Sequence, residues 1–308
     1  MTVELLGDYS FQVVATGAAL LGIMSGMIGC FALLRKEGLL GDGIAHATLP
    51  GVYLGFLFFG SHETEWLLLG GLFTGILASY MIFFMIKNSK IKFDAALALI
   101  LSLFFGFAMV LKTYVSGSAQ GGQSGLDRFV YGQASAILLE DVKMIAVSTI
   151  FLGITLCYFW KEFTLITFDA EFAQVSGIPC RKIELLLHFL LVFVIVLGMQ
   201  TVGVILMSAM LVNPAVAARQ WVQHLRGMVL LSAVFGSISA VIGTFFSSSV
   251  SNLPTGPVIV LCGSMITFFS ILFAPKRGVF FQIHQRKRKK RELTAALSKE
   301  MQKGRGDL

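Results

Sequence analysis

Two side chains in the first part of the sequence are suited to bind a metal ion. Asp42 and His46 lie in GLLGDGIAHATLPG, residues 38–51, and their spacing of four places both on one face of a helix, about one turn apart. A hard carboxylate oxygen and an imidazole nitrogen make half of a divalent-metal site. Two copies of this helix meeting across a two-fold axis would supply two Asp and two His ligands, enough for a tetrahedral ion.

The same two residues also admit structural interpretations. Asp42 and His46 could form an internal ion pair, or Asp42 could cap a helix beside a buried histidine. Pro50 removes a backbone donor just beyond the pair, and the neighbouring glycines permit local unwinding. In a membrane, such unwinding is tolerated only where the backbone lines a cavity.

The remaining histidines are weaker candidates for a metal ligand. His188 lies in the middle of the apolar run ELLLHFLL and could supply a third ligand, although we prefer a donor to a carbonyl inside the helix bundle. His62, His224 and His284 fall in loops or in the C-terminal tail, where we expect them to be solvated.

Composition places these residues in a membrane protein. Of the 308 residues, 56% are hydrophobic and 13% are charged, whereas soluble domains have about 25% charged residues. This balance excludes a water-soluble globular enzyme. A carboxylate or imidazole at bilayer depth is costly unless paired, wetted or liganded, so the Asp42–His46 pair is a functional hypothesis.

The positive charge is confined to the C-terminal tail. Residues 276–308 hold 11 Lys/Arg and 3 Asp/Glu, a net charge of +8, so the remainder of the chain has −1. We expect the tail to contact anionic lipid, or secondly to extend toward a cytoplasmic protein partner; no nucleic-acid partner is needed to explain it. The four cysteines show no CxxC spacing, and the acidic N-terminal segment is unlike a secretory signal peptide.

The hydropathy pattern predicts an all-α, polytopic helical bundle of about 8–9 transmembrane helices within residues 1–275. Apolar stretches long enough to span a bilayer occur at 11–34, 39–60, 66–86, 94–114, 142–160, 184–200, 202–218, 228–247 and 255–274. With nine spans and the N-terminus outside, 21 Lys/Arg face the cytoplasm and 3 face outward. This split satisfies the positive-inside rule and predicts a cytoplasmic C-terminus. The boundary between the spans within 184–218 could fall anywhere from Gly198 to Gly203.

A second informative segment follows the fifth span. Residues 163–182, FTLITFDAEFAQVSGIPCRK, predict a short amphipathic helix that Gly177 and the following proline end. Its acidic residues Asp169 and Glu171 disfavour an anionic lipid surface, and its apolar face includes Phe172. We therefore expect this cytoplasmic segment to fit the groove of a protein partner.

Sequence motifs of an ATPase or a hydrolase are missing. There is no G-x-x-x-x-G-K-[ST], because the glycine-rich run at 117–125 has no lysine, and there is no HExxH. The chain is therefore expected not to be an enzyme. An intramembrane metal enzyme would need a third ligand and a catalytic base, and no suitable glutamate accompanies His188.

Three motifs resemble those of one known family. GDGIAHATLPGVYLG, FDAEFAQVSGIP and LVNPAVAAR are similar, in order, to the metal motif, the ATPase-docking segment and a later span of the bacterial ABC-type manganese/zinc/iron permeases. The resemblance covers about residues 10–275. Gly43 departs from it, since alanine is more usual there.

The resemblance implies an ABC importer permease of the metal-chelate type in the bacterial cell membrane. It implies a pore of two permease chains, which we expect to be identical, together with two ATP-binding subunits and an extracytoplasmic metal-binding protein. Asp42 and His46 would be the metal ligands, and the coupling segment, about 163–180, would include Asp169, Glu171, Phe172 and Gly177. No permanently bound cofactor is implied.

The transported ion is expected to be Mn²⁺. The oxygen and nitrogen ligands admit manganese, iron and zinc, and a site without thiolate suits an expandable six-coordinate shell; Zn²⁺ or Fe²⁺ is the alternative. A passive channel or secondary transporter would share the spans but would not need the docking segment. The pore of a vitamin or siderophore importer should be lined by bulkier apolar residues and should lack an Asp–His pair.

Overall fold

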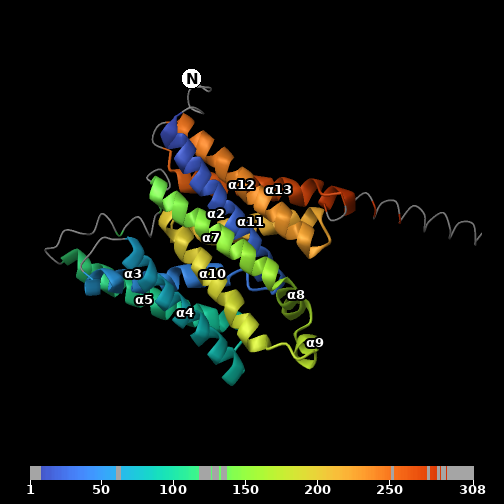
Figure 1. Cartoon of the computed structure of the whole chain (residues 1–308), viewed down its shortest axis with the longest axis horizontal. Helices are drawn as coiled ribbons and strands as arrows, with labels where there is room; N and C mark the ends of the chain where they lie inside the picture. Colours follow the sequence, from blue (N-terminus) through green and yellow to red (C-terminus); the bar gives the residue numbers. More distant parts are fainter. Residues whose placement is uncertain are drawn as a thin grey trace, which may run out of the picture.

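The protein is an assembly of α-helices (Figure 1). The structure is a computed structural model that describes residues 8–59, 64–117, 126, 132, 137–250, 253–275, 278–282, 285 and 289. Within these ranges, nine helices have 18 or more residues. They are α2 (Tyr9–Leu34), α3 (Leu40–Phe59), α4 (Thr64–Asn88), α5 (Phe93–Gly117), α7 (Leu139–Tyr158), α10 (Cys180–Val202), α11 (Val204–Trp221), α12 (Leu225–Ser249) and α13 (Thr255–Phe273).

These nine helices correspond to the nine apolar stretches of the sequence, which confirms the all-α membrane bundle. Judged by length and composition, seven of them are long and apolar enough to cross a membrane. The other two, α3 and α11, are the helices that carry polar motifs and an internal proline, Pro50 in α3 and Pro214 in α11. Their lower hydropathy reflects their polar residues, which include Asp42 and His46 in α3 and Asn213 and Arg219 in α11.

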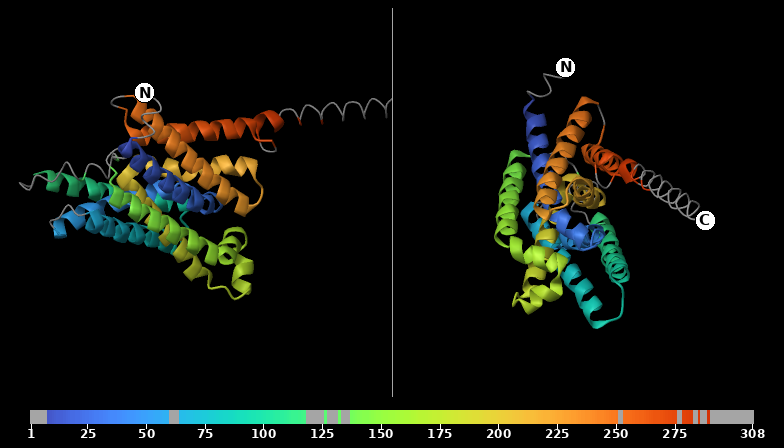
Figure 2. Two further views of the ribbon diagram at one scale, coloured as in Figure 1. Left: turned by 45° about the horizontal axis from the view of Figure 1, so that its top comes forward. Right: turned by 90° about the vertical axis from the view of Figure 1, so that its right-hand side faces the viewer.

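The helices form two groups that meet through α10 and through a direct contact of α11 with α3 (Figures 1 and 2). Helix α2 packs along α12, α11 and α7, while α3 packs between α4 and α5. Helix α10 contacts members of both groups. It is the most enclosed of the seven candidate spans: 78% of the residues in its most apolar stretch are buried, against 28% for α5 and for α7. The outer helices therefore present apolar side chains to lipid, and α10 forms the centre.

Small residues allow the helix backbones to touch. A β-carbon on Gly22 or Gly26 of α2 would overlap the backbone of α12 at Gly236 or Ser232, and the Ser232 hydroxyl donates to the Gly26 carbonyl at 2.8 Å. This small-xxx-small contact provides the close packing that lipid-embedded helices require. Gly22 and Gly26 of α2 thus have the packing role that is typical of such patterns.

The chain reverses between α10 and α11 at one residue. Gly203 has φ 89° and ψ 160°, a conformation that is essentially restricted to glycine. Val202 ends one helix and Val204 begins the next. The boundary between these two spans therefore lies at Gly203, the last residue of the range Gly198 to Gly203 that the sequence predicts.

The basic tail lies almost wholly outside the described residues. Helix α13 ends at Phe273, and beyond residue 275 the structure describes only Gly278–Gln282, Gln285 and Lys289. The division into a membrane domain at 1–275 and a tail at 276–308 stays a prediction.

Candidate metal centre

Asp42 and His46 lie in the first two turns of α3, on one face. The distance from Asp42 Oδ1 to His46 Nε2 is 3.8 Å, which is too long for a hydrogen bond. Two atoms that share one ion at bond lengths of about 2.0–2.2 Å lie about 3–3.5 Å apart, so a small side-chain rotation suffices for both to bind the same cation. Because α3 begins at Leu40, Asp42 is inside the first turn and is not the N-cap.

The carboxylate of Asp42 faces open space. Its side chain is 42% exposed and lines a cavity of about 770 Å³ between the start of α3, the end of α2 and α11. The opposite wall contains the polar side chains of Ser208 and Asn213, both on α11. The cavity is open on one side of this chain, and the cationic side chains of Lys36 and Arg219 also line it.

The ring of His46 is oriented by packing. It meets Phe105 of α5 edge-on, with ring centroids 5.1 Å apart, and its Nδ1 is buried without a hydrogen-bond partner among the described residues. Metal-bound histidines commonly fix the ring by donating from the second nitrogen; here the aromatic contact aims Nε2 toward Asp42.

This pair supplies only part of a coordination shell. No group of three or more His, Cys, Asp or Glu side chains able to hold a metal occurs in the described part of the chain. If a metal ion binds to this pair, solvent or a second chain would provide the other ligands.

The segment after α7 forms two short helices, α8 (Trp160–Phe168) and α9 (Ala170–Val175). Asp169 caps α9, its Oδ1 accepting from the Phe172 backbone N–H at 2.9 Å. Gly177 ends it at φ 80°, while Ile178 donates to the Ala173 carbonyl at 3.1 Å, as in a Schellman motif. The expected short helix and its glycine stop are both present.

One face of this segment is apolar and exposed. Phe168, Phe172 and Val175 are 64%, 57% and 88% exposed, and Glu171 is exposed beside them. Ala173, on the opposite face, is fully buried. These apolar side chains are exposed at the outside of the chain, where another molecule can cover them.

Comparison with known proteins decides the family. Residues 8–274 match the ABC 3 transport family. The chain is 43% identical over 285 residues to the zinc transport system membrane protein TroC of Treponema pallidum, covering 92% of this chain and 96% of TroC. This chain belongs to the ABC 3 transport family.

Two other similarities agree with that assignment. The manganese transport system membrane protein MntC of Bacillus subtilis is 44% identical over 268 residues, which is 87% of this chain and 62% of that longer protein. The solved structure of PsaBC from Streptococcus pneumoniae in complex with Fab superposes with a TM-score of 0.79 at 31% identity, covering 90% of this chain and 98% of that one. This ABC 3 family member is therefore a multi-pass permease of the bacterial cell membrane.

Sequence reasoning missed one charged residue of this permease. Glu37, in the turn before α3, is 8% exposed, and its Oε2 lies 3.2 Å from His188 Nε2. Burial by itself would raise the pKa of Glu37, but the hydrogen bond with His188 and the charge of Arg35 hold this pKa below its ordinary value. The partner of His188 is thus a carboxylate and not the expected carbonyl. The two residues are 151 positions apart, and no local pattern indicates their contact.

Proposed function

We propose that this chain is the membrane-spanning subunit of an ATP-driven importer of divalent transition metal, with Mn²⁺ as the principal ion. The observation that carries the proposal is the one-turn Asp42–His46 pair, with the carboxylate on an open cavity. An acid and an imidazole within a membrane helix usually mark an ion pathway, and we assign Asp42 and His46 no other role.

We further propose that two copies of this chain form the pore. One chain offers a single carboxylate and a single imidazole, and a two-fold axis would complete the site from Asp42 and His46 of each copy. Ligands held on two separate chains can part when the chains move, which suits a site that must release its ion.

The ATP-binding subunits are proposed to dock on α8–α9. The exposed residues Phe168, Phe172 and Val175 form a small apolar anchor of the type that fits a partner's groove. ATP hydrolysis is assigned to those subunits, and this chain is assigned no catalytic residue. A metal-binding protein would deliver the ion to the opposite side, on loops near 115–141, most of which lie outside the described residues.

Mn²⁺ is proposed ahead of Zn²⁺ because of the ligand types. Carboxylate oxygen and imidazole nitrogen without thiolate suit an ion that adds oxygen ligands, as manganese does. The intrinsic affinity of such ligands would favour zinc over manganese. Selection of manganese must therefore come from the coordination geometry of the site and from which ion is delivered to it. Zn²⁺ or Fe²⁺ import by the same architecture is the alternative.

Transport by the complete complex in proteoliposomes tests this function. The ATP-binding subunits, ATP and magnesium are supplied on one side, and the loaded binding protein with Mn²⁺, Zn²⁺ or Fe²⁺ on the other. We expect accumulation that requires ATP and is fastest with Mn²⁺. Equal flux without ATP would instead support a passive channel, and accumulation driven by an ion gradient would support a secondary transporter.

A further inference from the structure

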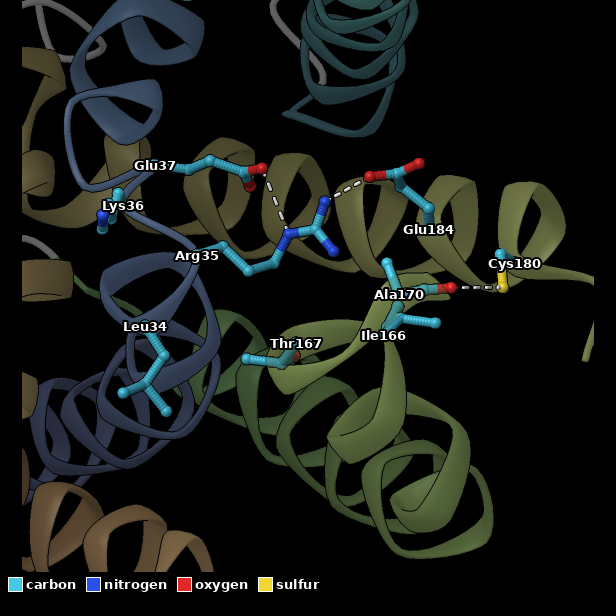
Figure 3. Close-up of a pocket in the computed structure, with 9 residues that line it drawn as sticks. All are labelled: Leu34, Arg35, Lys36, Glu37, Ile166, Thr167, Ala170, Cys180 and Glu184. Atoms are coloured by element: carbon cyan, nitrogen blue, oxygen red, sulfur yellow. Dashed lines mark hydrogen bonds and ion pairs between the residues drawn. The ribbon is translucent and has the colours of Figure 1, made fainter. Parts of the chain in front are cut away.

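Four polar side chains attach the turn between α2 and α3 to α10. Arg35 Nε donates to Glu37 Oε1 at 3.1 Å, and Arg35 Nη2 donates to Glu184 (Figure 3). The other oxygen of Glu37 pairs with His188. Glu184 and His188 are four positions apart on α10, so the turn is held on one helix face at two points, one helical turn apart. We call Arg35, Glu37, Glu184 and His188 the clamp.

The clamp is joined to α3 through the backbone of Glu37. The Glu37 N–H donates to the Ala32 carbonyl at 2.8 Å and closes α2, while the Glu37 carbonyl accepts from the Leu40 N–H at 2.9 Å and opens α3. One residue therefore ends one helix, begins the next and is bound to α10. Asp42 follows five positions later, so a movement of Glu37 must move the start of the helix that carries it.

On its other side, the clamp faces α8 and α9. A cavity of about 260 Å³ lies between them, lined by Arg35, Glu37 and Glu184 on one side and by Ile166, Thr167 and Ala170 on the other. The Cys180 thiol, at the start of α10, contacts the Ala170 carbonyl at 3.8 Å. The start of α10 thus contacts the short-helix segment, one turn before Glu184.

We propose that the clamp transmits movement of α8–α9, through α10, to Asp42 and His46. This inference rests on the proposed function, in which α8–α9 is the docking segment. Arg35 and Glu37 are positioning residues, because they act on α3 and not on the ion. The cavity beside the clamp leaves room for α8–α9 to shift.

The chemistry of the clamp requires each of its members. Arg35 uses two different nitrogens to reach two carboxylates, which a lysine ammonium cannot reproduce in the same fork geometry. Removing Arg35 or His188 leaves the buried Glu37 carboxylate without one of its partners, and removing Glu184, whose side chain is 39% exposed, frees the second nitrogen of Arg35. Loss of any one member should therefore loosen the turn.

The ratio of ATP hydrolysed to ions transported tests the proposal in the complete complex. For Arg35→Lys and Glu37→Gln we expect this ratio to rise at least about fivefold, the low end of ordinary coupling between sites. Glu184→Gln should raise it as well, and this variant leaves the buried Glu37–His188 contact in place, so it keeps the test open if the others fail to fold. Lys182→Gln, an exposed change on the same helix, is the control and should leave the ratio unchanged.

Three results would overturn the clamp. ATP hydrolysis and transport that fall together at a constant ratio in all three variants would assign these residues to structural stability alone. Absence of ATP-dependent uptake by the wild type would overturn both the clamp and the proposed function, whereas a normal wild type with unchanged variants would overturn only the clamp.

Discussion

The backbones of Gly51 and Gly70 are in direct contact. A β-carbon built on either glycine would overlap the carbonyl oxygen of the other, so the backbones of α3 and α4 leave no room for a side chain at this point. This contact follows Pro50, where α3 lacks one backbone hydrogen bond. Helix α4 therefore supports α3 beyond the weak point, while the clamp holds its start.

Alanine at either glycine should separate the two helices. We expect Gly51→Ala and Gly70→Ala each to destabilise the protein by about 1–3 kcal/mol, as overpacking does, because the overlapping atoms belong to backbone that cannot rotate away. Thermal unfolding in detergent measures the effect. Gly153→Ala in α7 is the matched control, since a β-carbon there meets nothing within 4 Å, and it should be neutral or slightly stabilising. Equal stability of all three variants would contradict the contact.

Lys36 is strained and should benefit from replacement by glycine. It has φ 62° at the position after the C-cap of α2, where helices commonly have glycine. We expect Lys36→Gly to be more stable than Lys36→Ala by about 1 kcal/mol. Both variants lose the charge, so the difference isolates the backbone. No difference in the midpoint of thermal unfolding would refute the strain.

The Glu37 carboxylate should stabilise the protein in a defined range of pH. Because its folded pKa lies below the ordinary value of 4.5, its stabilisation is present above 4.5 and is lost as the pH falls through the lowered pKa. The groups around it are Arg35 at the end of α2 and His188 and Glu184 on α10. We expect the difference in thermal midpoint between wild type and Glu37→Gln to shrink as the pH is lowered below about 4.5. A difference that grows with acidity would contradict this assignment.

The exposed face of α8–α9 should bind the ATP-binding subunit. Phe172→Ser and Val175→Ser remove apolar area from the proposed anchor, so we expect each to weaken assembly of the complex by tenfold or more, corresponding to about 1.4 kcal/mol. Co-purification of the ATP-binding subunit with this chain at increasing dilution measures the strength of assembly. Phe172→Leu keeps an apolar side chain and should assemble nearly normally; assembly by both serine variants at wild-type strength would exclude this face.

Local patterns in the sequence were sufficient for the helices and for the ends of α9. Hydropathy identifies the spans because each must bury about 20 apolar residues in lipid. Asp169 and Gly177 act on backbone groups within a few residues of themselves, so their roles can be predicted without knowledge of the fold.

Contacts between distant residues could not be predicted in the same way. The sequence places His188 in an apolar run but gives no indication of Glu37, because that contact depends on how α10 packs against the α2–α3 turn. The Asp42–His46 spacing is local and was predictable, whereas the cavity beside Asp42 requires α11 to lie across from α3.

The most direct test of the account is ATP-dependent Mn²⁺ uptake by Asp42→Asn and His46→Ala. Asp94→Asn, an exposed acid in the first turn of α5, and His224→Ala, an exposed histidine before α12, are the matched controls. All four variants should insert in the membrane and assemble in normal amounts. The account predicts that the first two abolish uptake while both controls transport normally; uptake at the wild-type rate by Asp42→Asn and His46→Ala would contradict it.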